Sequence, residues 1–488
     1  MKIAYLTAGA GGMYCGSCMR DNTLAAALIR QKRDVVLIPM YSPIKTDEPS
    51  VSTERVFYGG INVFLQQKSS LFRFGSRLLD RVLDAPAVLR LAMRRAGATT
   101  PEGLGPLTIS MLRGEDGAQR RELDKLIEGL AAYRPDVVHL PDALFVGLAR
   151  PLHEALGAAI VCTLTGEDIF LDALPAGHRA EAHDLIRQAA PDVHGFIAVS
   201  RHYANYASEN FGVPDDRLHH VPMGIRIEPH ERGTESAGAR PFTIGYLARI
   251  CPEKGLHVLC DAFIELHRRG RPCRLRVAGY TPESSKGYVA EIAEKLEKAG
   301  VRESVDLLGE VDRRGKLELL RSCDVFSVPT VYREAKGIYV LEAMSQGVPV
   351  VQPAHGSFPE LIEATGGGLL FPPNDVSALA DRMIELMDQP ELRDQLGSRG
   401  RRGVAELYHE DRMAEGAWNV FAKAVDLRRS LVESSQSASD AGHVTGARCQ
   451  VDLQAVPDAI RAGDRPAGCV AEPDRGRGGR DRGAIGLR

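Results

Sequence analysis

Residues 334–350 read Glu334-Ala-Lys-Gly-Ile-Tyr-Val-Leu-Glu342-Ala-Met-Ser-Gln-Gly347-Val-Pro-Val350, and they indicate the fold more clearly than any other part of the chain. Ile338–Gln346 has helical character, and Gly347 is the residue type that commonly follows a helix C-terminus. Short β-branched runs flank this helix at Val325–Val328 and Val348–Gln352, as expected for buried strands. The stretch therefore predicts a strand–helix–strand unit of a parallel sheet.

The same alternation extends outward from this unit in two series. A helix is expected at Asn22–Arg30, after a glycine-rich turn. The first series predicts strands at Lys2–Thr7, Val35–Pro39, Asp136–His139, Ala159–Thr163 and Gly195–Val199. The second predicts further strands at Phe242–Leu247, Arg274–Ala278, Val305–Leu307 and Gly368–Phe371. We expect the α/β class, with two Rossmann-like domains facing each other across a cleft where ligands of such sheets bind.

Breaks in this pattern suggest the domain boundaries. Residues 1–225 are the predicted N-terminal domain, with an insertion at about 45–130. Residues 226–240 are rich in Glu, Arg and Gly and read as a linker, and residues 241–407 form the second domain. A helix is expected at 408–430. The tail 431–488 has no aromatic residue, and its polar composition predicts disorder.

Composition excludes several classes of protein. The 488 residues include 61 basic and 64 acidic side chains, so a broad basic face for nucleic acid is not expected. No apolar run is long enough to span a membrane, and the first residues lack a signal-peptide core. Nine cysteines without framework spacing fit thiols in a reducing cytoplasm. The basic amphipathic stretch Phe72–Arg95 suggests peripheral membrane contact, which is not favoured because Asp80, Asp84 and Pro86 interrupt it.

The helix after Gly337 predicts an anion site. The amides of Gly337, Ile338 and Tyr339 fall in its first turn, where unpaired N–H groups and the helix dipole favour a negative charge. Glu334 precedes this turn, and Glu342 lies about one turn inside the helix. One carboxylate can meet a ligand beside the anion while the other accepts hydrogen bonds from hydroxyls. A diphosphate between a sugar and a ribose has that layout.

A second loop carries cations. Arg249 and Lys254 follow the predicted strand Phe242–Leu247, and a guanidinium together with an ammonium suits two phosphates that leave as a dianion. The sequence has no Asp-x-Asp pair of the kind that holds a divalent metal. We therefore expect no metal and no cofactor, with these cations and the helix N-terminus neutralising the charge.

These residues resemble the retaining nucleotide-sugar glycosyltransferases of family 4, which have the GT-B fold. Glu334 and Glu342 match the family's Glu-x7-Glu motif, and Arg249, Lys254 and Gly255 match its Arg-x4-Lys-Gly loop. The resemblance runs from residue 1 to about residue 430 and is weak between 45 and 130. It implies a nucleoside diphosphate sugar as donor, and front-face attack in which the leaving phosphate takes the acceptor's proton.

The resemblance also implies roles for single residues. Glu342 would bind the ribose, the cationic pair of the second loop would hold the diphosphate, and Glu334 would lie by the donor sugar. Gly11 and Gly12 would close over the phosphates. A last helix within Asp411–Ala424 would cross back onto the first domain.

The sequence departs from the family pattern near the sugar. Thr165 stands where members commonly carry a histidine, so Glu167 or Asp168 is expected to supply polar contacts to the sugar or acceptor. Lys336 replaces a phenylalanine and adds a cation near the sugar or acceptor.

The overall prediction is a hexosyltransferase acting on an unidentified acceptor, which is a glycan, a lipid-linked molecule or a small molecule. A nucleotide-sugar epimerase on the same fold and a non-catalytic sugar-nucleotide binding protein remain alternatives. Cys15-Gly-Ser-Cys18 invites a redox or zinc interpretation, but a single such pair is weak evidence. Loop packing or lining of the acceptor site is the favoured interpretation for it.

Overall fold

The strands of the computed structural model all run parallel to their sheet neighbours. The structure describes residues 1–9, 13–54, 56, 63, 67, 101–228 and 240–444. Within them, one six-stranded sheet contains β1 (Lys2–Thr7), β2 (Asp34–Pro39), β3 (Val137–Leu140), β4 (Ala159–Leu164), β5 (Gly195–Ala198) and β6 (Leu218–His220). The other contains β7 (Thr243–Leu247), β8 (Arg274–Ala278), β9 (Val305–Gly309), β10 (Val325–Phe326), β11 (Val350–Pro353) and β12 (Gly368–Phe371). This is the predicted architecture of two Rossmann-like sheets.

The strand order places a crevice in each sheet. The first sheet is ordered β2-β1-β3-β4-β5-β6 and the second β12-β11-β10-β7-β8-β9. The direction of winding reverses between β1 and β3 and again between β7 and β10. Loops leaving the carboxyl ends of strands at such a reversal diverge, and ligands of α/β sheets bind there.

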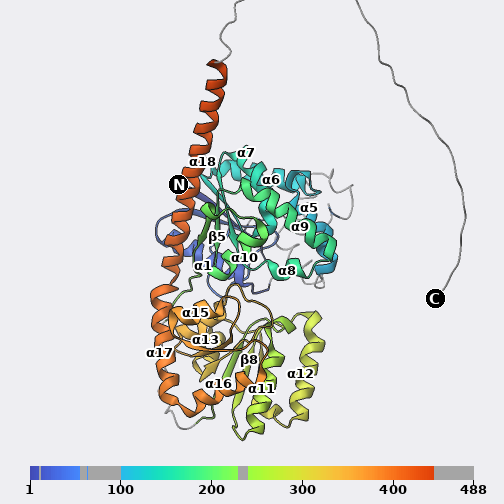
Figure 1. The fold of residues 1–488 in the computed structure, drawn as a ribbon, viewed down its shortest axis with the longest axis vertical. Helices are drawn as coiled ribbons and strands as arrows, with labels where there is room; N and C mark the ends of the chain where they lie inside the picture. Colours follow the sequence, from blue (N-terminus) through green and yellow to red (C-terminus); the bar gives the residue numbers. More distant parts are fainter. Residues whose placement is uncertain are drawn as a thin grey trace, which may run out of the picture. The chain divides into compact units, whose positions relative to one another are not determined.

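Helices cover both faces of each sheet (Figure 1). The sheet β1–β6 and its helices are called the N-terminal lobe, and the sheet β7–β12 with its helices the C-terminal lobe. N-terminal helices are α1 (Gly16–Arg30), α5 (Pro101–Leu112), α6 (Arg120–Tyr133), α7 (Ala149–Leu156), α8 (Asp168–Asp172), α9 (Ala176–Ala189) and α10 (Arg201–Phe211). C-terminal helices are α11 (Leu256–Arg268), α12 (Lys286–Lys298), α13 (Arg313–Arg321), α14 (Ile338–Ser345), α15 (Phe358–Thr365), α16 (Val376–Asp388) and α17 (Pro390–Leu407).

The last helix, α18 (Glu410–Val444), packs on the first sheet. Its Met413, Ala417 and Phe421 are buried in one cluster with Tyr5 of β1 and Leu24 of α1. Each large apolar side chain buried in this way contributes roughly 2 kcal/mol. Residues Met1–Glu433 form one compact unit, and α18 continues into the second unit, Ser434–Arg488.

Some boundaries differ from the sequence predictions. The helix expected at Asn22–Arg30 begins earlier, at Gly16. Its start was predicted too late because the first turn contains small residues that were interpreted as part of the glycine-rich turn. The edge strand β6 was not predicted, because its sequence Leu-His-His lacks an apolar alternation. The segment expected to be disordered from 431 starts as helix, since α18 reaches Val444.

Other predictions lie partly or wholly outside the described residues. These are the glycines Gly11 and Gly12, the stretch Phe72–Arg95, most of the linker and the tail beyond 444. Where it is described, the end of the insertion 45–130 forms α5 and most of α6. In the described ranges, no helix combines the length and apolar character needed to cross a membrane.

Candidate functional site

A cavity of about 390 Å³ lies between the two lobes. Loops that leave the carboxyl ends of β1, β4, β7, β8, β9 and β10 surround it, so the strand order explains its position. The structure brings most of the sequence-predicted site residues to its wall: Thr165, Arg249, Lys254, Glu334, Lys336, Gly337, Ile338, Tyr339 and Glu342.

Glu334 is the most completely buried of the charged residues predicted for the site, at 3% exposure. Its Oε2 atom accepts hydrogen bonds from the Lys254 ammonium at 2.5 Å, from the Tyr332 hydroxyl at 2.7 Å and from the Tyr339 hydroxyl at 2.8 Å. Its Oε1 atom accepts the backbone N–H of Lys336 at 3.2 Å. Three donors on one oxygen fix the carboxylate in a single orientation at the cavity wall.

These contacts keep Glu334 charged. Burial alone would raise the pKa of Glu334, but the ammonium groups of Lys254 and Lys336 and the Tyr332 hydroxyl together lower it well below its usual range. The side chain of Lys254 is 16% exposed, so it is shielded from water and still lines the cavity. The pair therefore places a fixed negative charge beside a fixed positive charge.

Two glycines allow the loops that carry this pair to approach each other. Gly255 has φ +68°, and a Cβ atom there would lie 1.8 Å from the carbonyl oxygen of Pro329, on the loop after β10. Gly356 has φ +59°, and a Cβ atom there would lie 2.5 Å from both N and O of Glu334. Any larger residue at either position would displace the backbone that holds Glu334 or Lys254.

Two helices begin at the cavity. Gly337 is the N-cap residue of α14, and the first intrahelical donor is Val340, which bonds to Gly337 O at 2.9 Å. The preceding N–H groups have no partner within the helix. The N-terminus of α1 lies opposite, since a Cβ atom on Gly16 would be 4.0 Å from Ile338 Cγ2. The exposed Arg249 lies at the same wall and adds a positive charge to those of the two helix N-termini.

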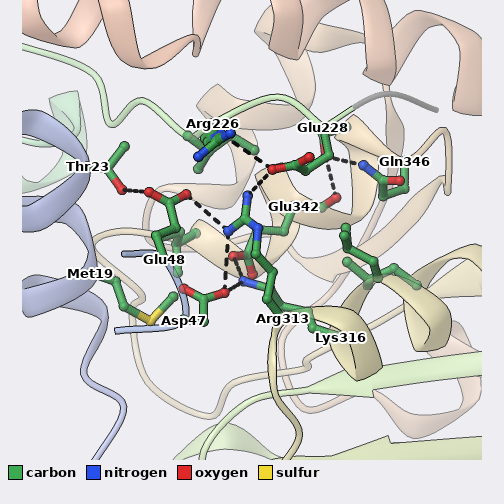
Figure 2. Close-up of a pocket in the computed structure, with 15 residues that line it drawn as sticks. Met19, Thr23, Asp47, Glu48, Arg226, Glu228, Arg313, Lys316, Glu342 and Gln346 are labelled. Carbon is green, nitrogen blue, oxygen red and sulfur yellow. Dashed lines mark hydrogen bonds and ion pairs between the residues drawn. The ribbon is translucent and has the colours of Figure 1, made fainter. Parts of the chain in front are cut away.

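Glu342 lies in a cluster of charged side chains contributed by both lobes (Figure 2). Its Oε1 atom accepts a hydrogen bond from Lys316 at 2.5 Å, and Lys316 also pairs with Asp47 of the N-terminal lobe. Arg313 bonds to Glu48 at 3.0 Å and to Glu228 at 2.6 Å. Burial raises the pKa of Glu342, and the Lys316 ammonium opposes that rise.

Lys336 connects the lobes across the cavity. Its ammonium donates to the carbonyl oxygen of Thr165 at 2.6 Å and to Ser17 Oγ at 3.1 Å. The cation that replaces a phenylalanine in the family pattern therefore bonds to the residue that replaces a histidine.

Glu167 and Asp168 are not among the residues that line the cavity. The Glu167 carboxylate instead accepts the Thr165 N–H at 2.8 Å and the Tyr203 hydroxyl at 2.6 Å, so it holds the loop after β4 in place. Burial and the charge of Glu167 raise the pKa of Asp168 to about 6. The polar contacts of Glu167 are thus directed into the protein rather than into the cavity, and the buried Oδ1 atom of Asp168 has no hydrogen-bond partner in the part of the chain that the structure describes.

Sequence reasoning did not identify Tyr332, Lys316 or Asp47. Tyr332 precedes Glu334 by two residues, and an aromatic residue so close to the motif could have been proposed as a site residue from the sequence. Lys316 and Asp47 lie in segments with little hydrophobic periodicity. Only the folded structure brings Lys316 into contact with both Asp47 and Glu342. No spacing in the sequence reveals them.

Two family models match the chain. One, described as "Glycosyl transferases group 1", matches residues 229–403, and the other, described as "Glycosyltransferase Family 4", matches residues 100–229. Together they span residues 100–403, which is more than half of the chain.

Individual relatives are more distant. The chain is 27% identical to WcaL of Salmonella typhimurium over 41% of its own length and 50% of that protein, so it spans about half the length of this relative. It is 24% identical to a GDP-mannose-dependent monoacylated alpha-(1-6)-phosphatidylinositol monomannoside mannosyltransferase of Corynebacterium glutamicum, over 62% of this chain and 77% of that protein. The crystal structure of Anabaena HepE in complex with UDP superimposes with a TM-score of 0.59 at 17% identity, covering 90% of this chain and 100% of that chain. At that identity the likeness concerns the fold alone.

Proposed function

This protein is a glycosyltransferase of family 4 with the GT-B fold, and we propose that it transfers a sugar from a nucleoside diphosphate donor to an acceptor, with retention of configuration and without a metal ion. The transferred sugar is expected to be a hexose. The observation that carries the proposal is the convergence of Arg249, Lys254, Lys336 and two helix N-termini on one cavity, which the buried carboxylate of Glu334 also lines.

The cations and helix N-termini at this cavity suit a diphosphate. Arg249 and Lys254 supply charged donors, and the amides of Gly337, Ile338 and Tyr339 supply neutral ones. These groups would stabilise the charge that grows on the leaving diphosphate, which is the role that a divalent cation plays in other enzymes. Glu342, one turn further along α14, would then meet the ribose hydroxyls of the same ligand.

Glu334 is better suited to stabilising positive charge than to attacking the sugar. A carboxylate that already accepts bonds from Lys254 and two tyrosines is a weak nucleophile, because each donor withdraws electron density from it. Its charge is nevertheless fixed beside the cavity, where positive charge develops on the sugar ring during transfer. This arrangement supports front-face transfer, in which the leaving diphosphate receives the proton of the acceptor.

The proposal is tested by screening UDP, GDP and ADP for thermal stabilisation, followed by transfer assays with sugars on the base that binds. A ligand at 100 times its Kd should add about 2.7 kcal/mol to the free energy of unfolding. Transfer should continue in EDTA, and proton NMR should show the same anomeric configuration in product and donor. Failure of all three nucleotides to bind would contradict the proposal, as would sugar-nucleotide turnover that needs no acceptor and yields an epimer.

Replacing Glu342 by alanine should raise the Kd of the nucleoside diphosphate by about tenfold to a hundredfold, because a hydrogen bond to a charged group contributes about 1.5–3 kcal/mol. Isothermal titration of UDP, GDP or ADP measures the change. Lys316 keeps Asp47 as its partner in this variant, so the local charge remains balanced. The control is Glu363→Ala, which removes an exposed glutamate of α15. Equal affinity in both variants would show that Glu342 does not bind the nucleotide.

A further inference from the structure

Cys15 and Cys18 lie at the start of α1, and Cys15 lines the wall of the proposed donor cavity. Cys15 is the N-cap residue of this 15-residue helix, with an extended backbone (φ −123°, ψ 126°), and it lines the cavity beside Tyr14 and Gly16. Cys15 is partly exposed, whereas Cys18, one turn inside the helix, is 1% exposed. No step of the proposed transfer uses either thiol.

Cys15 at the N-cap and Cys18 in the first turn of α1 are three residues apart, a spacing at which the side chains of a helix are neighbours. They are therefore close enough for a modest side-chain rotation to bring them into bonding range. Both cysteines are reduced in this structure. A Cys-x-x-Cys pair at a helix N-terminus, with its first cysteine accessible and its second buried, is the arrangement in which one thiol attacks and the other resolves.

The surroundings of Cys15 favour its thiolate. The neighbouring Cys18 thiol, the Lys336 ammonium and the N–H groups at the start of α1 lower the pKa of Cys15, although burial opposes them. Lys336 is held at this position by its bonds to Ser17 and Thr165. Elsewhere in the described ranges, burial raises the pKa of Cys260, Cys273 and Cys323 to about 12. Among the cysteines that the structure describes, Cys15 is therefore the one whose surroundings favour the thiolate.

We propose that Cys15 and Cys18 form a thiol–disulfide exchange site in which Cys15 reacts with low-molecular-weight disulfides that enter the cavity and Cys18 resolves the product. The Cys15 thiolate attacks one sulfur of the disulfide RSSR, the S–S bond breaks, and the departing thiolate takes a proton to leave as RSH. Cys18 then loses its proton and attacks the Cys15 sulfur, the bond between that sulfur and SR breaks, and the departing thiolate takes a proton to leave as the second RSH. Two protein thiols are oxidised to one disulfide, and one external disulfide is reduced to two thiols.

The exchange would control access to the cavity, and this consequence rests on the proposed function. A mixed disulfide on Cys15 places a bulky group between the helix N-termini where the diphosphate is expected. The intramolecular disulfide adds no bulk and removes the negative charge of the Cys15 thiolate, which repels an anionic ligand. The mixed disulfide should therefore bind nucleotide less well than the reduced enzyme, whereas the intramolecular disulfide should bind it at least as well.

Oxidised glutathione and iodoacetamide are the probes, and peptide-resolved mass spectrometry assigns each modification to a single cysteine of the full chain. At pH 6, iodoacetamide should label Cys15 about tenfold faster than an ordinary thiol, since at that pH the larger thiolate fraction outweighs the lower nucleophilicity. The labelling rate should fall less than threefold between pH 8 and about pH 6, where an unperturbed thiol loses most of its reactivity.

Two variants separate the roles of the cysteines. Glutathione disulfide should convert the wild type to an intramolecular disulfide without retained glutathione, whereas Cys18→Ser should keep one glutathione on Cys15. Cys15→Ser should lose both reactions while Cys18 stays unmodified. Dithiothreitol should restore the wild-type thiols. Slow labelling of Cys15, or an unchanged reaction in Cys15→Ser, would overturn the exchange site.

Nucleotide protection tests the link to the donor site separately. A nucleoside diphosphate at ten times its Kd should slow the labelling of Cys15 about tenfold, because only the free protein reacts. Rapid labelling that no nucleotide slows would leave the exchange chemistry in place and overturn its control of donor binding. Failure of every nucleotide to bind, with the thiol reactions intact, would count against the proposed function alone.

Discussion

Replacing Glu334 by glutamine is expected to lower kcat by about two to three orders of magnitude, with less than about a threefold change in the Kd of the nucleoside diphosphate. The glutamine amide has the same shape and can still accept the tyrosine hydroxyls, so the loop should keep its position. The fixed negative charge is lost, and with it the electrostatic stabilisation of the sugar as it becomes positive. Because the nucleotide alone carries no such charge, its affinity should change little.

The measurement is steady-state transfer from the sugar nucleotide that the thermal screen identifies, with nucleotide affinity measured by calorimetry. The matched control is Glu363→Gln, which changes an exposed glutamate of α15. A normal kcat in Glu334→Gln would exclude an electrostatic role for this carboxylate. A large loss of nucleotide affinity at unchanged kcat would indicate that Glu334 contacts the diphosphate rather than the sugar.

The pH dependence gives a second check on the same residue. Since the pKa of Glu334 is lowered well below its usual range, the carboxylate stays charged throughout the working range of the enzyme. The rate should therefore show no acidic limb from Glu334 between about pH 5 and pH 8. An acidic limb in that range that disappears in Glu334→Gln would contradict the charge state on which the mechanism depends.

The sequence analysis assigned Glu334 and Lys254 to one ligand site without predicting their contact, and the topology explains why they lie close together. Both follow strands that the structure places side by side, β7 and β10, at the point where the winding reverses. Once the β-branched runs were assigned to parallel strands, the loops after them had to share one edge of a sheet. Local patterns thus determined which groups lie near each other, although not the hydrogen bonds between them.

The contacts between the lobes could not be predicted in this way. Asp47 belongs to the N-terminal lobe and Lys316 to α13 of the C-terminal lobe, and their pairing depends on how the two lobes pack against each other. The same holds for Lys336, whose bonds to Ser17 and Thr165 cross the cavity. Hydrophobic periodicity records which face of an element is buried, but it contains no information about a polar contact between separate sheets.

The beginning of α1 shows a different limit. Gly16, Ser17 and Cys18 have low helix propensity, so the sequence analysis assigned them to the turn formed by the preceding glycines. In the structure these residues form the first turn of α1, because the buried face of the helix continues through Cys18 and Asn22 to Leu24. Tertiary packing overrides propensity there, and it moves the Cys-x-x-Cys pair from a loop to a helix N-terminus.

Replacing Lys254 by methionine should destabilise the protein by about 3 kcal/mol, even though the new side chain fills a similar volume. The substitution removes the ammonium group that bonds to the Glu334 carboxylate, and this carboxylate is buried at 3% exposure. Urea unfolding measures the change. The control is Lys286→Met, which breaks an exposed ion pair with Glu283 and should change stability by less than about 0.5 kcal/mol.

Combining Lys254→Met with Glu334→Gln should recover at least half of that loss, because the double variant buries no unpaired charge. The pH dependence of the single Lys254→Met variant follows from the same balance. Without the Lys254 ammonium, burial is expected to raise the pKa of Glu334 above its unfolded value, so protonation stabilises the folded state. The variant should therefore be less destabilised near pH 5 than near pH 8, with the difference disappearing in the double variant. If the double variant is as unstable as the single one at both pH values, Lys254 contributes through packing, and the charge pair is not what holds Glu334 at the cavity wall.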